Sequence, residues 1–107
     1  MGNQRLGDIM GRPYSGQFLV ELDRADPERI GVQLARICVR ANLPATHVAK
    51  AFGVSRMSIH SWFRGKYVRE KNYTKIKNFI KTVEDDLKTG HLPAKTSKFA
   101  KVYLESL

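Results

Sequence analysis

The sequence predicts an all-α protein, folded as a small bundle of four to five helices. Apolar residues recur at the three- and four-residue spacing of helices in several segments, and no segment alternates as a strand would. Capping residues and prolines mark the expected helix starts, and glycines mark several of the expected ends. The 107 residues are 42% hydrophobic and 27% charged, which is typical of one folded domain.

The first predicted helix covers residues 27–41. Asp26 before it is a good N-cap residue, and Pro27 suits the first helical position. Pro44 follows its end, and the residue before a proline is pushed out of the helical region. The apolar face of this helix holds Ile30, Leu34, Ile37 and Cys38.

The next two helices are short and meet at a glycine. We expect them over residues 45–52 and 56–64, with Ser55 as the N-cap of the second one. Gly53 supplies the positive φ of a sharp turn, and Ala49 is small where the second helix comes closest. The apolar positions are Val48, Ala49 and Phe52, then Ile59, Trp62 and Phe63. Two short helices joined by a tight turn with a glycine have the plan of a helix-turn-helix.

Two further helices are expected after this motif. The first covers residues 71–89 and ends before Gly90, a residue favoured just past a helix end. The second covers residues 94–105 and follows Pro93. The apolar sides are Tyr73, Ile76, Ile80, Val83 and Leu87 in the first helix, and Phe99, Val102 and Tyr103 in the second.

The ends of the chain have less regular patterns. Residues 1–16 contain four glycines and a proline without a period, which predicts an irregular arm. The apolar run at residues 17–22 is too short for its periodicity to decide between helix and strand, and we expect it to pack the arm onto the core. The chain is therefore divided into an arm over residues 1–26, a helix-turn-helix domain over 27–90 and a tail over 91–107.

Positive charge is concentrated in the middle of the chain. Lys and Arg total 19 and Asp and Glu total 10, which gives a net charge of +9. No acidic residue lies between Glu28 and Glu70, and this stretch contains Arg29, Arg36, Arg40, Lys50, Arg56, Arg64, Lys66 and Arg69. Such a charge on a small protein favours a polyanionic partner, first nucleic acid and second an anionic membrane surface. A solvated basic face that serves solubility is the alternative.

Several classes of function are disfavoured. Cys38 is the only cysteine, so neither an intrachain disulfide nor a cysteine-based zinc site is expected. The three histidines are scattered, and neither a catalytic constellation nor a phosphate-binding Gly-Lys-Ser/Thr loop occurs, so we expect no enzyme, metal or cofactor. No apolar stretch is long enough to span a membrane, and the first residues lack the apolar core of a secretory signal, so we expect a cytoplasmic protein.

Residues 46–65, THVAKAFGVSRMSIHSWFRG, resemble the helix-turn-helix of the lambda repressor and Cro family of phage and bacterial regulators. In that family a small residue, Gly-Val-Ser, Ile, Trp and Gly follow one another in this order. The matching residues are Ala49, Gly53, Val54, Ser55, Ile59, Trp62, Gly65 and Lys66. The resemblance covers about residues 27–90 and implies an all-helical bundle that binds DNA. Where the family often has Gln, this sequence has Thr46, His47 and Arg56.

The resemblance implies that the helix starting near Arg56 enters the major groove. Arg56 is the first candidate for base recognition, because the bidentate arginine–guanine contact is the commonest specific one; a phosphate contact or a free side chain is the alternative. The candidate base contacts are Ser55, Arg56, Met57, Ser58, His60 and Ser61. The candidate phosphate contacts are Thr46, His47, Lys50, Arg64, Lys66 and Arg69. Trp62 and Cys38 are interpreted as core residues.

The expected function is that of a sequence-specific DNA-binding protein, a transcriptional regulator in a bacterial cell or a phage-infected host. The alternative is a DNA-binding accessory factor in packaging, recombination or DNA architecture. Specific affinity is commonly reached by two modules on neighbouring half-sites, so we expect a homodimer that uses the tail. The alternative is that Phe99 and Tyr103 fold back onto their own bundle.

Overall fold

A computed structural model describes residues 13–107 of the chain. Within this range the protein is all-helical, with six α-helices, one short 3-10 helix and no strand, so the predicted fold class is confirmed. The helices are α2 (Gly16–Arg24), α3 (Ile30–Ala41), α4 (Ala45–Phe52), α5 (Arg56–Phe63), η1 (Glu70–Asn72), α6 (Tyr73–Lys88) and α7 (Ser97–Glu105). Most of the predicted irregular arm, residues 1–12, lies outside the described residues.

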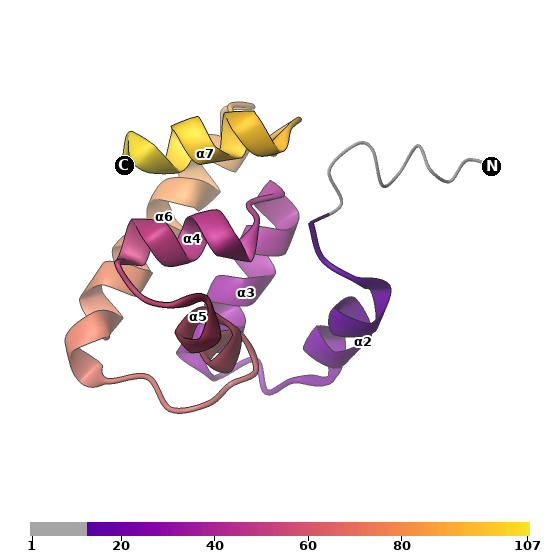
Figure 1. The fold of residues 1–107 in the computed structure, drawn as a ribbon, viewed down its shortest axis with the longest axis vertical. Coiled ribbons are helices and arrows are strands. Elements are labelled where there is room, and N and C mark those ends of the chain that lie inside the picture. Colours follow the sequence, from indigo (N-terminus) through magenta and orange to yellow (C-terminus); the bar gives the residue numbers. More distant parts are fainter. Residues whose placement is uncertain (1–12) are drawn as a thin grey trace.

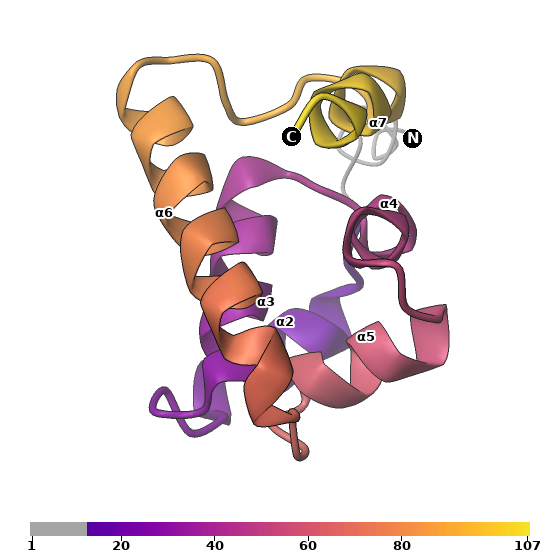
Figure 2. The ribbon, with the colours of Figure 1, turned by 90° about the vertical axis from the view of Figure 1, so that its left-hand side faces the viewer.

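Helix α3 lies at the centre of the bundle and packs against α5, α6 and α2. Helix α4 packs against α5 on one side and against α7 on the other, so that α5, α4 and α7 follow one another in both views (Figures 1 and 2). One hydrophobic core connects these elements, from Tyr14 before α2 to Leu104 in α7. The described part of the arm and the tail therefore share one core with α3, α4, α5 and α6.

The two helices of the predicted helix-turn-helix have the expected bounds. Gly53 ends α4 with a φ of 69°, and the N–H of Val54 donates to the carbonyl of Ala49 at 3.0 Å. Ser55 caps α5, because its Oγ accepts the N–H of Ser58 at 3.0 Å. Both boundaries depend on residues close in sequence, which explains why the sequence pattern located them.

Helix α3 begins later than predicted. Asp26 is not its N-cap: the Asp26 carboxylate accepts the N–H of Glu28 at 2.9 Å, and residues 26–29 form a turn that precedes Ile30. An aspartate can hydrogen-bond to the backbone two residues on and stabilise a turn in place of a helix start. The end of α3 is as predicted, and Asn42 adopts the left-handed conformation there with a φ of 59°.

The apolar run near the N-terminus forms α2. Ser15 caps this helix by accepting the N–H of Phe18, and Leu22 is buried on its inner face. The ring of Tyr14 stacks on Phe18 at a centroid distance of 5.3 Å, and its hydroxyl donates to the buried carbonyl of Leu43 at 2.6 Å. This confirms the expectation that the run packs onto the core. The run is a helix, which its short periodicity could not decide.

The last two predicted helices are shifted at their starts. Residues 70–72 form η1 before α6, and α7 begins at Ser97, where Thr96 caps it by accepting the N–H of Phe99. The predicted apolar side of α7 is partly wrong, because Ala100 and Leu104 are the buried residues whereas Phe99 is 44% and Val102 is 57% exposed. Before α7 the N–H of Ala94 donates to the carbonyl of Ala41 at 2.9 Å, which ties this segment to the end of α3 in place of a first helical turn.

Candidate nucleic-acid interface

Helix α5 has one buried side and one outward side. Ile59, Trp62 and Phe63 are buried, which confirms Trp62 as a core residue. All six candidate base contacts lie in α5 or at its N-cap. Of these, Ser55, Arg56 and Met57 are exposed, and Ser58, His60 and Ser61 are half-buried. The N-terminal turn of α5 is therefore its most accessible part, and the thioether side chain of Met57 is 81% exposed.

The two serines at this end are engaged with one another. Besides accepting the N–H of Ser58, the Ser55 hydroxyl donates to the Ser58 hydroxyl at 3.1 Å. The Ser55 side chain is therefore committed to capping α5. Ser58 accepts that bond, and its own O–H is left to donate to another group.

His60 lies one turn after Arg56 and one turn before Arg64. Partial burial lowers the pKa of His60, and the positive charges of Arg56 and Arg64 lower it further. Its ring meets Phe63 edge to face, with the centroids 6.4 Å apart. At neutral pH the imidazole is therefore uncharged, and it has one donor and one acceptor nitrogen for a polar partner.

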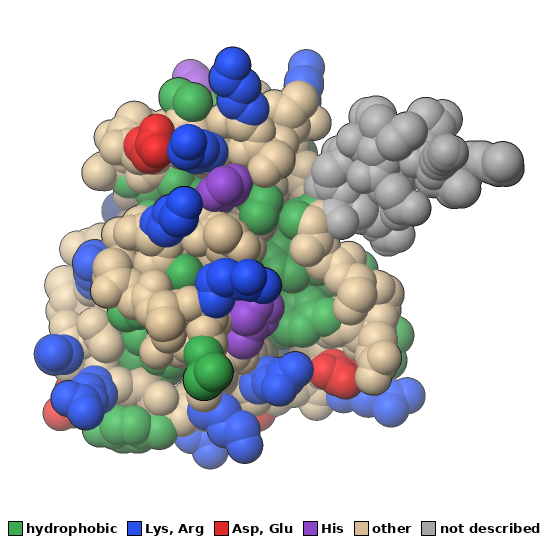
Figure 3. All heavy atoms as spheres, viewed as in Figure 1, with side chains coloured by type: hydrophobic (Ala, Val, Ile, Leu, Met, Phe, Trp, Pro, Cys, Tyr) green, Lys and Arg blue, Asp and Glu red, His purple; other side chains and the backbone are tan. Residues whose placement is uncertain are grey.

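The candidate phosphate contacts fall into two groups. Lys50, Arg64, Lys66 and Arg69 are exposed, and within residues 13–107 none of them is in an ion pair; the two ion pairs found there are Arg29–Asp26 and Lys81–Asp85. Thr46 and His47 are half-buried at the start of α4. His47 is hydrogen-bonded to α7, since its Nε2 lies 3.1 Å from the Ser97 hydroxyl. Lys and Arg side chains prevail over Asp and Glu on the face that carries α4 and α5 (Figure 3).

Two residues that the sequence analysis did not select hold α4 and α5 in position. Gly31 of α3 lies directly beneath the end of α5, where an added Cβ would be 2.0 Å from the carbonyl oxygen of Trp62. Lys75 of α6 donates to the carbonyl of Phe52 at 3.2 Å and lies over the Phe52 ring, where it neutralises the negative end of α4. A glycine inside a helical pattern was the only sequence signal for the first contact.

A cluster of aromatic rings between α4, α5 and α6 supports the orientation of α5. The rings of Phe52 and Trp62 meet edge to face at 5.9 Å, and Phe52 also packs on Phe79 at 5.1 Å. Phe79 was not among the predicted apolar positions of α6. Because these rings come from α4, α5 and α6, the orientation of α5 depends on all three helices.

The thiol of Cys38 lies in the interior of the protein. Cys38 is fully buried, and burial raises the pKa of its thiol, so the sulfur stays protonated and inaccessible. Within residues 13–107 no cluster of three or more histidine, cysteine, aspartate or glutamate residues could hold a metal ion. None of the helices described there is long and apolar enough to cross a membrane.

Comparison of the chain with models of protein families, with curated proteins and with solved structures found no match. The candidate interface is therefore defined by the geometry and the charge of this chain. It consists of the outward side of α5, the exposed lysine of α4 and the basic loop between α5 and η1.

Proposed function

We propose that this protein binds double-stranded DNA as a sequence-specific regulator, as its resemblance to the lambda repressor and Cro family implies. The observation that carries the proposal is the helix-turn-helix geometry of α4 and α5 combined with unpaired cations around it. Lys50, Arg64, Lys66 and Arg69 are exposed on the elements that flank α5. Exposed, unpaired cations on both sides of a helix with an accessible N-terminal turn are the electrostatic pattern that favours binding to a DNA backbone.

The proposed complex places α5 in the major groove. Helix α5 has eight residues, and an α-helix with its side chains is about 10–12 Å across, which fits a major groove about 12 Å wide. Arg56, at the accessible end of α5, donates to the O6 and N7 of a guanine, and Met57 contacts a thymine methyl group. The exposed cations on either side bind phosphates and fix the register of α5.

Selection from a random pool of duplexes tests this function, followed by titration of the chosen and of scrambled DNA. Arg56→Ala is expected to cost about 1–3 kcal/mol on the chosen sequence and to relax specificity at one position. Lys66→Ala is expected to weaken both duplexes nearly equally, because phosphate contacts carry no sequence information. Lys88→Ala is the matched control, since Lys88 ends α6 at the end remote from α5 (Figure 2).

The outcomes separate the candidate functions. Enrichment of one sequence and a discrete footprint support a regulator. Tight binding without enrichment, with diffuse protection, supports an accessory factor that recognises DNA shape. A wild-type protein that binds neither duplex at low salt contradicts DNA binding altogether.

The proposed regulator acts as a homodimer whose interface includes α7. Tyr103 and Leu104 are occupied within their own bundle: the Tyr103 hydroxyl donates to Asp86 at 2.5 Å, and Leu104 is buried. Phe99 and Val102 leave an apolar edge of α7 open to a second copy. Since removal of the tail would strip Leu104 from the core, the test uses the full chain. Phe99→Ser/Val102→Ser is expected to sediment as a monomer at micromolar concentration, and a wild-type protein that is monomeric both free and on DNA contradicts the dimer.

A further inference from the structure

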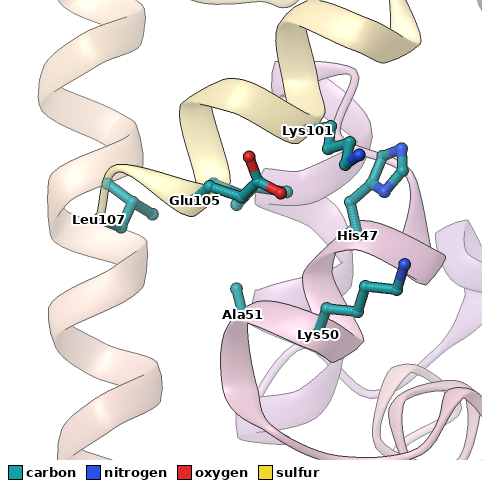
Figure 4. A pocket seen from close by; sticks show the side chains of 7 residues that line it. His47, Lys50, Ala51, Lys101, Glu105 and Leu107 are labelled. Atoms are coloured by element: carbon teal, nitrogen blue, oxygen red, sulfur yellow. The ribbon is translucent and has the colours of Figure 1, made fainter.

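Helix α7 and helix α4 form a hollow that the helix-turn-helix itself does not contain. His47, Lys50 and Ala51 of α4 line one side, and Lys101 and Glu105 of α7 line the other, around a volume of about 260 Å³ (Figure 4). The hydrogen bond between His47 Nε2 and the Ser97 hydroxyl ties the start of α7 to the start of α4. The position of α7 beside α4 is therefore fixed by a polar contact as well as by the buried Leu104.

The lysines of the tail repeat at a spacing that brings them together. Lys95, Lys98 and Lys101 are three residues apart, so Lys98 and Lys101 lie one turn apart on the same side of α7. Both are exposed, and neither forms an ion pair within the described part of the chain, although Glu105 lines the same hollow as Lys101. The basic side chains over α7 continue those over α4 and α5 on one face of the molecule (Figure 3).

We propose that Lys98 and Lys101 of α7, together with Lys50 of α4, bind backbone phosphates of the same duplex that α5 reads. This inference rests on the proposed function. In a helix-turn-helix the first helix crosses the DNA backbone while the second lies in the major groove. Helix α7 lies on the side of α4 away from α5, so its lysines face phosphates farther along that strand, beyond the contacts of α4.

The distribution of apolar residues favours DNA over a lipid surface as the partner of these lysines. Ala100 and Leu104 are buried in the protein core, so that Phe99 and Val102 are the exposed apolar side chains of α7. Membrane-surface helices bury a broad apolar face between the headgroups, and α7 has already buried its own against the bundle. The exposed lysines of α7, Lys98 and Lys101, instead favour binding to the phosphates of a DNA backbone.

The test is a double substitution with a matched control of equal charge. Lys98→Ala/Lys101→Ala is expected to weaken binding of chosen and random duplexes alike, roughly 10- to 60-fold at 0.1 M salt, because each phosphate contact contributes a factor of about eight between 0.1 M and 1 M salt. The salt slope should lose about two units. Lys88→Glu lowers the net charge by the same two units at the exposed end of α6, remote from α5, and is expected to leave the slope unchanged.

A third variant changes affinity in the opposite direction. Glu105→Gln removes the carboxylate beside Lys101 and is expected to tighten binding several-fold, a gain that a merely destabilised protein would not show. If the wild type binds DNA but the α7 double variant matches its α6 control, the role of α7 is overturned while the proposed function stands. The role of α7 is also overturned if binding to vesicles containing phosphatidylserine requires Lys98 and Lys101, whereas the α7 double variant binds DNA as tightly as the wild type does. A wild type that binds no DNA contradicts the proposed function itself.

Discussion

Gly31 allows α3 and α5 to approach each other closely. Replacement by alanine would bring a methyl group to within 2.0 Å of the Trp62 carbonyl, a backbone atom that cannot rotate away. We expect Gly31→Ala to lower the free energy of unfolding by about 1–3 kcal/mol or more, as overpacked cores do, and to displace the end of α5. Urea denaturation measures the first effect, and DNA affinity measures the second.

Gly16 provides the control for this substitution. It is the first residue of α2, its φ is not positive, and no atom lies within 4 Å of an added Cβ. Gly16→Ala should therefore be neutral or slightly stabilising, because it reduces the freedom of the unfolded chain. Equal losses of stability in the two variants would show that the contact between Gly31 and Trp62 is not the cause.

His60 reports the electrostatic environment of α5. Burial first, and then the charges of Arg56 and Arg64, lower the pKa of His60. Arg56→Ala is expected to raise that pKa without returning it to 6.5, because the burial remains. An NMR titration of the imidazole protons measures the change, and Lys88→Ala should leave the titration unaltered. A pKa insensitive to Arg56 would place that side chain away from His60.

The same shift has a consequence for stability. Because the pKa of His60 is lower in the folded protein than in the unfolded chain, the unfolded state binds the proton more readily. The contribution of neutral His60 to stability is therefore present above pH 6.5 and is lost as the pH falls through the folded-state value. His60→Gln should weaken this acid dependence.

The turn between α4 and α5 depends on backbone conformation alone. Gly53 has a φ of 69°, yet no atom lies within 4 Å of an added Cβ, so a substitution there strains the backbone without a steric clash. Gly53→Val is expected to cost about 1–3 kcal/mol and to lower the melting temperature. Gly53→Asn should cost less, since asparagine tolerates this region, as Asn42 does at the end of α3. Equal melting temperatures for the wild type and the valine variant would contradict this account of the turn.

At the level of elements, local signals predicted more than distant ones. Helices α4 and α5 were located correctly, because Ser55 and Gly53 act on backbone groups within a few residues. The buried side of α7 was predicted only in part, because Phe99 and Ala100 satisfy a helical pattern equally well and only the surface against which α7 packs, mainly that of α4, selects between them. Asp26 has the chemistry of a cap, but it stabilises the turn over residues 26–29 that directly precedes α3.

In the candidate site, too, local sequence signals predicted more than contacts between distant residues could. The sequence identified the outward residues of α5, since the opposite positions are apolar. It did not show that the Ser55 hydroxyl is engaged in capping, or that His47 is bonded to Ser97 across fifty residues. Gly31 and Lys75 were missed, because their roles depend on contacts with Trp62 and Phe52.

For the whole molecule, the positive charge predicts strongly salt-dependent binding. Five to seven phosphate contacts from the basic residues between Arg29 and Lys81 give a slope of log K against log salt of roughly −4 to −6 per protomer, and two contacts from α7 would add about −2. Titration of the wild type between 0.05 M and 0.5 M salt measures the slope. An affinity that does not change with salt would contradict nucleic-acid binding.

The helical class, the two short helices that meet at Gly53 and the excess of positive charge follow from the sequence alone, because periodicity, capping residues and composition act locally or add up over the chain. Three features came from the three-dimensional arrangement: Tyr14 and Leu22 share one core with the tail, Gly31 must lack a side chain, and Lys101 lies beside His47 and Lys50. These features arise from contacts between residues far apart in sequence, and a pattern read within one segment carries no information about the surface that the segment meets.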